Sequence, residues 1–207
     1  MIHRGACNGT QQQIEGKIMQ TRQLRLTGAF IALVLAVTSM LALPALAEER
    51  VCRGTLGAIT VDNLRVPQNA TCWLNGTQVE GTITVQTNAT LIANRVHVNG
   101  NVQAENAKNV VVTASTIGGS VQVDQGGAAS VVRSTVTGDI QYDANKGYLK
   151  ANNNQVGGSI QVVGNTGGAE IFTNVIDGNL QCKENRPAPT GGGNTVGGNK
   201  EDQCARF

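Results

Sequence analysis

The chain of 207 residues carries a formal net charge of only +2, and aromatic residues make up 3% of it. The positive charge belongs to residues 1–47, where four Lys and Arg residues face a single Glu, so the rest of the chain has a net charge of about −1. A balance this close to neutral excludes the basic surface that nucleic-acid binding requires. We therefore expect no nucleic-acid partner.

Residues 1–47 have the pattern of a leader that is removed on export. Arg22 and Arg25 precede an apolar run of 16 residues, and Ala45-Leu46-Ala47 places small residues where a signal peptidase reads them. A membrane span needs roughly 20 apolar residues. The pattern therefore predicts a signal peptide cleaved after Ala47 and a periplasmic or extracellular protein with no membrane span after cleavage. Met19 stands directly before a signal of normal length, which suggests that translation starts there.

The cysteines beyond the leader are four in number: Cys52, Cys72, Cys182 and Cys204. An even count in an exported protein predicts two disulfides, for which three connectivities exist. The cysteines fall in two local pairs at opposite ends of the chain, which favours Cys52–Cys72 and Cys182–Cys204. Neither pair has CxxC spacing, and His97 is the only histidine outside the leader. We therefore predict no metal site and no cofactor.

A glycine recurs along the rest of the chain, first every 19 residues and then every 20. Aliphatic residues stand two positions before it and two and four positions after it, which predicts two short strands with a corner between them. A further apolar pair, nine and seven positions before the glycine, predicts a third strand. The repeated glycines are Gly81, Gly100, Gly119, Gly138, Gly158, Gly178 and Gly198.

A unit of three short strands cannot bury its own apolar face, whereas stacked units pair each strand with its equivalents above and below. No apolar segment of helical period lies between the strands. The repeat therefore predicts an all-β fold, a single-stranded parallel β-helix (solenoid) of 19–20-residue coils. We expect an N-terminal cap with an irregular first coil over 48–78, regular coils over 79–198, and a C-terminal cap and tail over 199–207.

Two polar columns follow the same period. Glutamines three positions after the glycine point outward and should form an exposed amide ladder. Residues four positions before the glycine point inward beside a corner, where their side chains can satisfy backbone groups. We interpret both columns as structural. The outward column is Gln103, Gln122, Gln141, Gln161 and Gln181; the inward one is Thr77, Val96, Ser115, Ser134, Asn154, Asn174 and Asn194. The glycine itself is expected at a corner that needs positive φ.

The extra residue of the 20-residue coils maps to one corner, within residues 143–148, 163–168 and 183–188. In solenoids such a corner is commonly the binding side, and it is also where insertions are simply tolerated. Both interpretations stay open. The candidate binding residues at this corner are Asp143, Lys146, Tyr148, Lys183, Glu184 and Arg186.

The last coils show a resemblance to a known group of proteins. The stretch from Gly178-Asn179-Leu180-Gln181-Cys182 through Pro187-Ala188-Pro189 to Gly191-Gly192-Gly193-Asn194-Thr195-Val196 resembles the C-terminal signature of exported bacterial β-helix repeat proteins without established activity. The resemblance covers about residues 52–204. It implies the right-handed parallel β-helix of the pectate-lyase-like superfold, and it transfers no functional residues.

Polysaccharide-cleaving enzymes with this fold need clustered carboxylates, with Arg or Lys as base or stabiliser. Asp124 and Asp143 lie at loop starts in neighbouring coils, but we interpret them as solvated turn residues, and His97 has no evident partner. We therefore predict no catalytic residue and no enzymatic activity. The expected role is structural or binding, at the cell envelope or outside the cell, for a monomer whose partner is a carbohydrate or an envelope protein. The alternative is a carbohydrate-active lyase-like or hydrolase-like protein.

Overall fold

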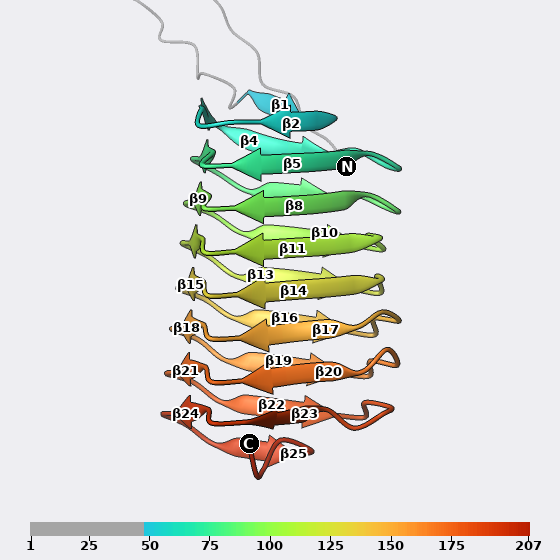
Figure 1. Ribbon diagram of the computed structural model, residues 1–207, viewed down its shortest axis with the longest axis vertical. Helices are drawn as coiled ribbons and strands as arrows, with labels where there is room; N and C mark the ends of the chain where they lie inside the picture. The colour runs from blue at the N-terminus through green and yellow to red at the C-terminus, as the bar shows by residue number, and fades with distance from the viewer. Residues whose placement is uncertain (1–47) are drawn as a thin grey trace, which may run out of the picture. The chain divides into compact units, whose positions relative to one another are not determined.

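The computed structural model describes residues 48–207, which form a parallel β-solenoid of about eight turns (Figure 1). Every element among these residues is a strand, as the repeat predicts. The predicted signal peptide, its cleavage after Ala47 and the proposed start at Met19 lie outside the described residues. No helix between residues 48 and 207 has the length and apolar character needed to cross a membrane.

Each turn contributes one strand to each of three parallel sheets. Sheet A contains β1 (Glu49–Val51), β4 (Asn63–Val66), β7 (Ile83–Val85), β10 (Val102–Glu105), β13 (Val121–Asp124), β16 (Ile140–Asp143), β19 (Ile160–Val163), β22 (Leu180–Lys183) and β25 (Lys200–Asp202). Sheet B contains β2 (Gly54–Leu56), β5 (Thr71–Asn75), β8 (Thr90–Asn94), β11 (Asn109–Thr113), β14 (Ala128–Val132), β17 (Leu149–Asn152), β20 (Ala169–Phe172) and β23 (Thr190–Gly192). Sheet C contains two-residue strands: β3 (Thr60–Val61), β6 (Gln78–Val79), β9 (His97–Val98), β12 (Thr116–Ile117), β15 (Thr135–Val136), β18 (Gln155–Val156), β21 (Val175–Ile176) and β24 (Thr195–Val196).

The core is a set of aliphatic columns inside the three sheets. The positions two before, two after and four after each repeated glycine are buried through the central coils, and so is the apolar pair of the third strand. Tyr142 replaces an aliphatic residue in one column and is 1% exposed. The column two after the glycine ends at Lys200, which is exposed. The predicted inward faces are therefore confirmed.

The expected reason for the repeated glycine is wrong. None of the seven glycines of the repeat has positive φ. Instead, successive coils stack so tightly at this corner that a Cβ on Gly119 would lie 2.9 Å from the Gly100 carbonyl oxygen and would also collide with the Asn101 side chain. That side chain is needed in place, because its Oδ1 accepts a hydrogen bond from the Ser120 backbone N–H at 2.8 Å. Glycine is required here for close approach, not for backbone conformation.

Positive φ occurs at the other two corners, mostly at residues with side chains. At the corner between sheets A and B these residues are Asn69, Asn88, Asn106, Gln125, Ala144, Gly164 and Glu184. At the corner between sheets B and C they are Gly76, Arg95, Ala114, Arg133, Asn153, Thr173 and Gly193. In both series the residue that follows points inward and is buried. The left-handed residue therefore turns the chain and directs the next side chain into the interior.

The inward polar column forms the predicted ladder between sheets B and C. The backbone N–H of Asn154 donates to Asn174 Oδ1 at 3.0 Å, and Asn154 Nδ2 donates to the same oxygen and to the Val131 carbonyl. The sequence analysis missed a second ladder of the same kind between sheets A and B. It consists of Asn145, Asn165 and Asn185, which are at most 3% exposed and hydrogen-bond to one another in the same way.

Both ends of the solenoid carry a disulfide, and the favoured pairings Cys52–Cys72 and Cys182–Cys204 are confirmed. Strands β1, β2 and β3 already pair with β4, β5 and β6, so residues before the first repeated glycine form a complete coil. At the C-terminal end, the Gln203 side chain exchanges hydrogen bonds with Asn185, and Lys200 Nζ donates to the Asn194 carbonyl at 2.9 Å. The polar ladders are thus closed by side chains of the last coil.

Replacing Gly119 with Val should destabilise the domain far more than replacing Gln122 with Val. The first change forces a side chain into close-packed backbone at a cost of about 1–3 kcal/mol, which for a domain of this size lowers Tm by roughly 2–4 °C per kcal/mol. The second alters an outward side chain and should cost less than about 0.5 kcal/mol. Thermal unfolding followed by circular dichroism measures both, and equal shifts would contradict the close approach at the glycine corner.

Replacing Asn165 with Ala should cost at least about 2 kcal/mol, because the backbone N–H of Asn145 and the carbonyl of Tyr142 lose their buried partner. Asn75→Ala is the matched control, because Asn75 is an exposed strand residue whose loss should change stability by less than about 0.5 kcal/mol. Urea unfolding gives both free energies. If Asn165→Ala left the free energy of unfolding unchanged, the ladder would not be what stabilises this corner.

Candidate binding face

The corner between sheets A and B is the predicted variable corner. On sheet A, Asp124 pairs with Asp143, nineteen residues further on. On sheet B, Ala129 pairs with Leu149, twenty residues further on, so one residue is added between the two strands. The added residue of each 20-residue coil lies on the sheet B side of the corner, just before the strand: Tyr148, Gly168 and Ala188. The longer coils therefore alter the outward surface of sheet B.

The candidate residues at this corner do not converge into one site. Asp143, Lys146 and Arg186 are exposed. Lys183 and Glu184 form an exposed ion pair at 3.7 Å with each other. A solvent-exposed pair of this kind contributes little free energy. Only Tyr148 takes part in a larger arrangement, and it does so by turning onto the outward surface of sheet B.

Tyr148 is the inserted residue of its coil and is 51% exposed. Gly168, the equivalent residue one coil on, has φ of +84° and no side chain, and the Tyr148 ring lies over it beside Pro187. The Tyr148 hydroxyl donates to Glu170 Oε2 at 2.7 Å. A side chain at residue 168 would meet this ring, since the place of its Cβ is 3.5 Å from Tyr148 Cδ2.

Glu170 lies at the centre of the arrangement and is held from three sides. Besides Tyr148, Asn152 Nδ2 donates to Glu170 Oε1 at 2.5 Å, and Lys150 Nζ lies 3.6 Å from the same oxygen. The hydrogen bonds from Tyr148 and then from Asn152 lower the pKa of Glu170, and the charge of Lys150 acts in the same direction. Glu170 is therefore a fixed, ionised acceptor on the surface of sheet B.

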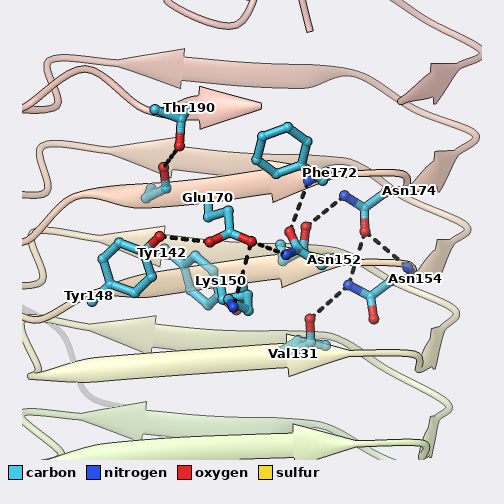
Figure 2. A network of polar contacts seen from close by, with 12 residues as sticks. Val131, Tyr142, Tyr148, Lys150, Asn152, Asn154, Glu170, Phe172, Asn174 and Thr190 are labelled. Atoms are coloured by element: carbon cyan, nitrogen blue, oxygen red, sulfur yellow. Dashed lines mark hydrogen bonds and ion pairs between the residues drawn. The ribbon is translucent and has the colours of Figure 1, made fainter. Parts of the chain in front are cut away.

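Phe172 completes the arrangement on the other side of Glu170. It is 37% exposed, and its ring lies over Gly192, the paired residue of the next coil. Asn152 Oδ1 accepts the backbone N–H of Phe172 at 2.9 Å, so one amide side chain orients both Glu170 and the strand that carries Phe172. Figure 2 shows Tyr148 and Phe172 on opposite sides of Glu170. We call this surface the aromatic face: Tyr148, Lys150, Asn152, Glu170 and Phe172.

One buried side chain, Tyr142, supports the aromatic face from inside the solenoid. The hydroxyl of Tyr142 donates to the Lys150 carbonyl at 2.8 Å and thereby anchors β17 from inside the solenoid. Burial raises the pKa of Tyr142 far above its ordinary value. The interior phenol thus stays protonated and keeps donating throughout the neutral and moderately alkaline range.

Sequence reasoning identified Tyr148 and missed Lys150, Asn152, Glu170 and Phe172. The signal was present in the repeat: the outward positions of sheet B carry no charged residue in the earlier coils and become Lys150 and Glu170 in the later ones. Only the register shows that Lys150 pairs with Glu170 and Asn152 with Phe172. Between residues 48 and 207, no three His, Cys, Asp or Glu side chains are grouped closely enough to hold a metal ion.

No family model, no curated protein and no solved structure matches this chain. Its function is therefore inferred from the geometry of its own surface.

The two tyrosines of the chain should report separately on the core and on the aromatic face. The hydrogen bond to Glu170 is the main cause that raises the pKa of Tyr148, whereas burial raises that of Tyr142. Near-ultraviolet titration should therefore show neither ionising at the usual pKa of about 10. In Glu170→Ala, Tyr148 should return toward that value while Tyr142 stays protonated.

The same titration has a consequence for stability. Above the unfolded pKa of about 10, the unfolded chain loses the Tyr142 proton while the folded protein keeps it. Stability should therefore be unaffected by this group below about pH 10 and decline as pH rises above it. An unchanged Tyr148 titration in Glu170→Ala would contradict the contact between Tyr148 and Glu170.

Proposed function

We propose that this chain is an exported, non-enzymatic carbohydrate-binding solenoid protein that acts in the periplasm or outside the cell. The observation that carries the proposal is the aromatic face, in which two exposed rings flank an ionised carboxylate that is already fixed by its neighbours. A purely structural role in the envelope does not account for these side chains, because the solenoid does not need them to bury its core.

Export is supported by two independent features. The disulfides Cys52–Cys72 and Cys182–Cys204 suit an oxidising compartment. The leader pattern of residues 22–47 supplies a route to such a compartment and would leave Glu48 as the first residue of the mature protein. The resemblance to exported bacterial β-helix repeat proteins of the pectate-lyase-like superfold agrees with this location.

A sugar ring presents apolar C–H surfaces and polar hydroxyl groups together. Tyr148 and Phe172 offer the apolar surfaces, while Glu170 accepts hydrogen bonds from hydroxyls and Lys150 donates them. Small-molecule sites combine such apolar contact with a few placed polar groups. Because Tyr148 and Asn152 hold Glu170 before any ligand arrives, little side-chain entropy is lost on binding.

The spacing of the rings favours a chain of sugars over a single one. Tyr148 and Phe172 occupy columns four residues apart along sheet B and lie in adjacent coils. Four residues of strand span roughly 13 Å. An oligosaccharide laid along the strands can contact both rings, with its middle over Glu170.

The electrostatics favour binding over cleavage. Glycoside hydrolysis uses a pair of carboxyl groups, one of which must be protonated to act as general acid. The aromatic face contains one carboxylate, Glu170, and its pKa is lowered by Tyr148 and Asn152. Glu170 is therefore suited to accept hydrogen bonds and poorly suited to donate a proton. The carbohydrate-active alternative requires turnover, which shortening of the oligosaccharide in the same samples would reveal.

A glycan array on the mature domain, followed by calorimetry with the best oligosaccharide, tests the proposal. Phe172→Ala and Tyr148→Ala should each weaken binding about tenfold or more, as loss of a ring anchor typically costs over 1 kcal/mol. Trp73→Ala is the matched control, because Trp73 is an exposed aromatic residue of sheet B, 45% exposed, outside the aromatic face.

Three outcomes would contradict the proposal. The first is an unchanged affinity of Phe172→Ala, and the second is an equal loss in Trp73→Ala. The third is time-dependent shortening of the bound oligosaccharide, which would establish the carbohydrate-active alternative in place of a binding protein.

A further inference from the structure

A concave surface lies on the outward side of sheet A, over strands β7, β10 and β13. It is a hollow of about 550 Å³. Its wall is formed by Gln68, Gln86 and Thr87, its floor by Gln103 and Gln122, and one side by Glu105 and Asp124. The hollow is separate from the aromatic face, which occupies sheet B over the later coils.

The wall exists because the left-handed residue of this corner stands one position later in the first coils, although the corner has the same length there. Two residues separate the last inward residue of sheet A from the left-handed residue at Val66–Asn69 and Val85–Asn88, and one does at Ala104–Asn106. The shift places one more residue beside sheet A. The Gln68 backbone N–H donates to Gln86 Oε1 at 3.2 Å, which ties the first two of these corners together.

The floor presents hydrogen-bond acceptors to the hollow. In the amide ladder, Gln103 Nε2 donates to Gln122 Oε1 at 3.2 Å and Gln122 Nε2 donates to Gln141 Oε1 at 3.0 Å. Each of these glutamines thus uses one of its two amide N–H donors toward the next coil. The ladder begins at Gln103 Oε1, which accepts no hydrogen bond from residues 48–207. An amide oxygen is therefore available at the start of the ladder.

The side of the hollow is negatively charged. Glu105 and Asp124 are paired in register on β10 and β13, so their side chains leave the same edge of sheet A. Neither forms an ion pair with a Lys or Arg between residues 48 and 207. Two neighbouring carboxylates and an amide oxygen attract a cation that can donate several hydrogen bonds.

We propose that this hollow binds a small organic cation with a protonated primary amino group. An ammonium group has three donors and no acceptor, which matches Glu105, Asp124 and Gln103 Oε1. The remaining hydrogen-bonding groups of the ligand face Gln68, Gln86 and Thr87. The hollow has the volume of a small-molecule site, and the proposal does not depend on carbohydrate binding at the aromatic face.

Calorimetry with cadaverine as the probe tests the proposal, with the uncharged pentanediol of the same length as comparison. Cadaverine should bind with saturation and the diol should not. The double variant Glu105→Gln, Asp124→Asn should bind cadaverine at least about tenfold more weakly. Asp143→Asn is the matched control, since Asp143 belongs to the same column one coil further on and does not line the hollow.

Phe172→Ala should bind cadaverine as the unchanged protein does, which separates this site from the aromatic face. Equal Tm values for the variants exclude unfolding as the cause of a loss. The proposal is overturned if the diol binds as well as cadaverine, if Asp143→Asn loses affinity as much as the double variant, if cadaverine does not saturate, or if calcium displaces cadaverine at lower concentration.

Discussion

The structure depends on one recurring interaction, in which a side-chain oxygen of one coil accepts a backbone N–H of its neighbour at a corner. Strand pairing fixes coils along the sheets, but backbone groups at the corners have no strand partner. Thr82, Ser120 and Ser159 serve the glycine corner in this way. Asn154 and Asn174 serve a second corner, and Asn145 and Asn165 a third. Because buried backbone groups must be satisfied, these side chains hold the coils in register.

The same interaction explains why the coil is so close to constant in length. A ladder tolerates an extra residue only where it does not separate a donor from its acceptor. The added residue at Tyr148 lies after Asn145 and before Leu149, between the ladder and the strand. In the first coils the corner has an unchanged length, but the left-handed residues Asn69 and Asn88 stand one position later after sheet A. Variation is therefore confined to one corner, where an added residue alters sheet B and a shifted left-handed residue alters the edge of sheet A.

Much of the fold could be predicted from sequence, because a period of 19–20 residues with alternating aliphatic positions has few physical solutions. The inward columns, the disulfide pairs and the ladder through Asn154 follow from parity and spacing. The role of Gly119 could not be predicted, since positive φ and close approach leave the same trace in a sequence. The ladder through Asn145 was missed because its earlier members are Ala89, Ala107 and Gly126, which hide the polar column.

The candidate site was harder to predict for a related reason. Tyr148 was identified from the extra residue, but Glu170 and Phe172 belong to two outward columns whose residue type changes from coil to coil. Nothing in a single coil indicates that Tyr148 will turn from its corner onto sheet B. That direction places the ring over Gly168 of the next coil and brings the hydroxyl to Glu170. Contacts between coils therefore define the site, and a sequence read one coil at a time does not contain them.

The coil repeat sets the distance between the two surfaces along the solenoid axis. The hollow on sheet A belongs to the coils of β7 to β13, and the aromatic face to those of β17 and β20. Their separation along the axis is a whole number of coil rises of about 4.8 Å each. Insertion of one coil between them would move the two surfaces apart by one such step and leave the contacts within each surface unchanged. Distance between sites can thus vary in this fold independently of what the sites bind.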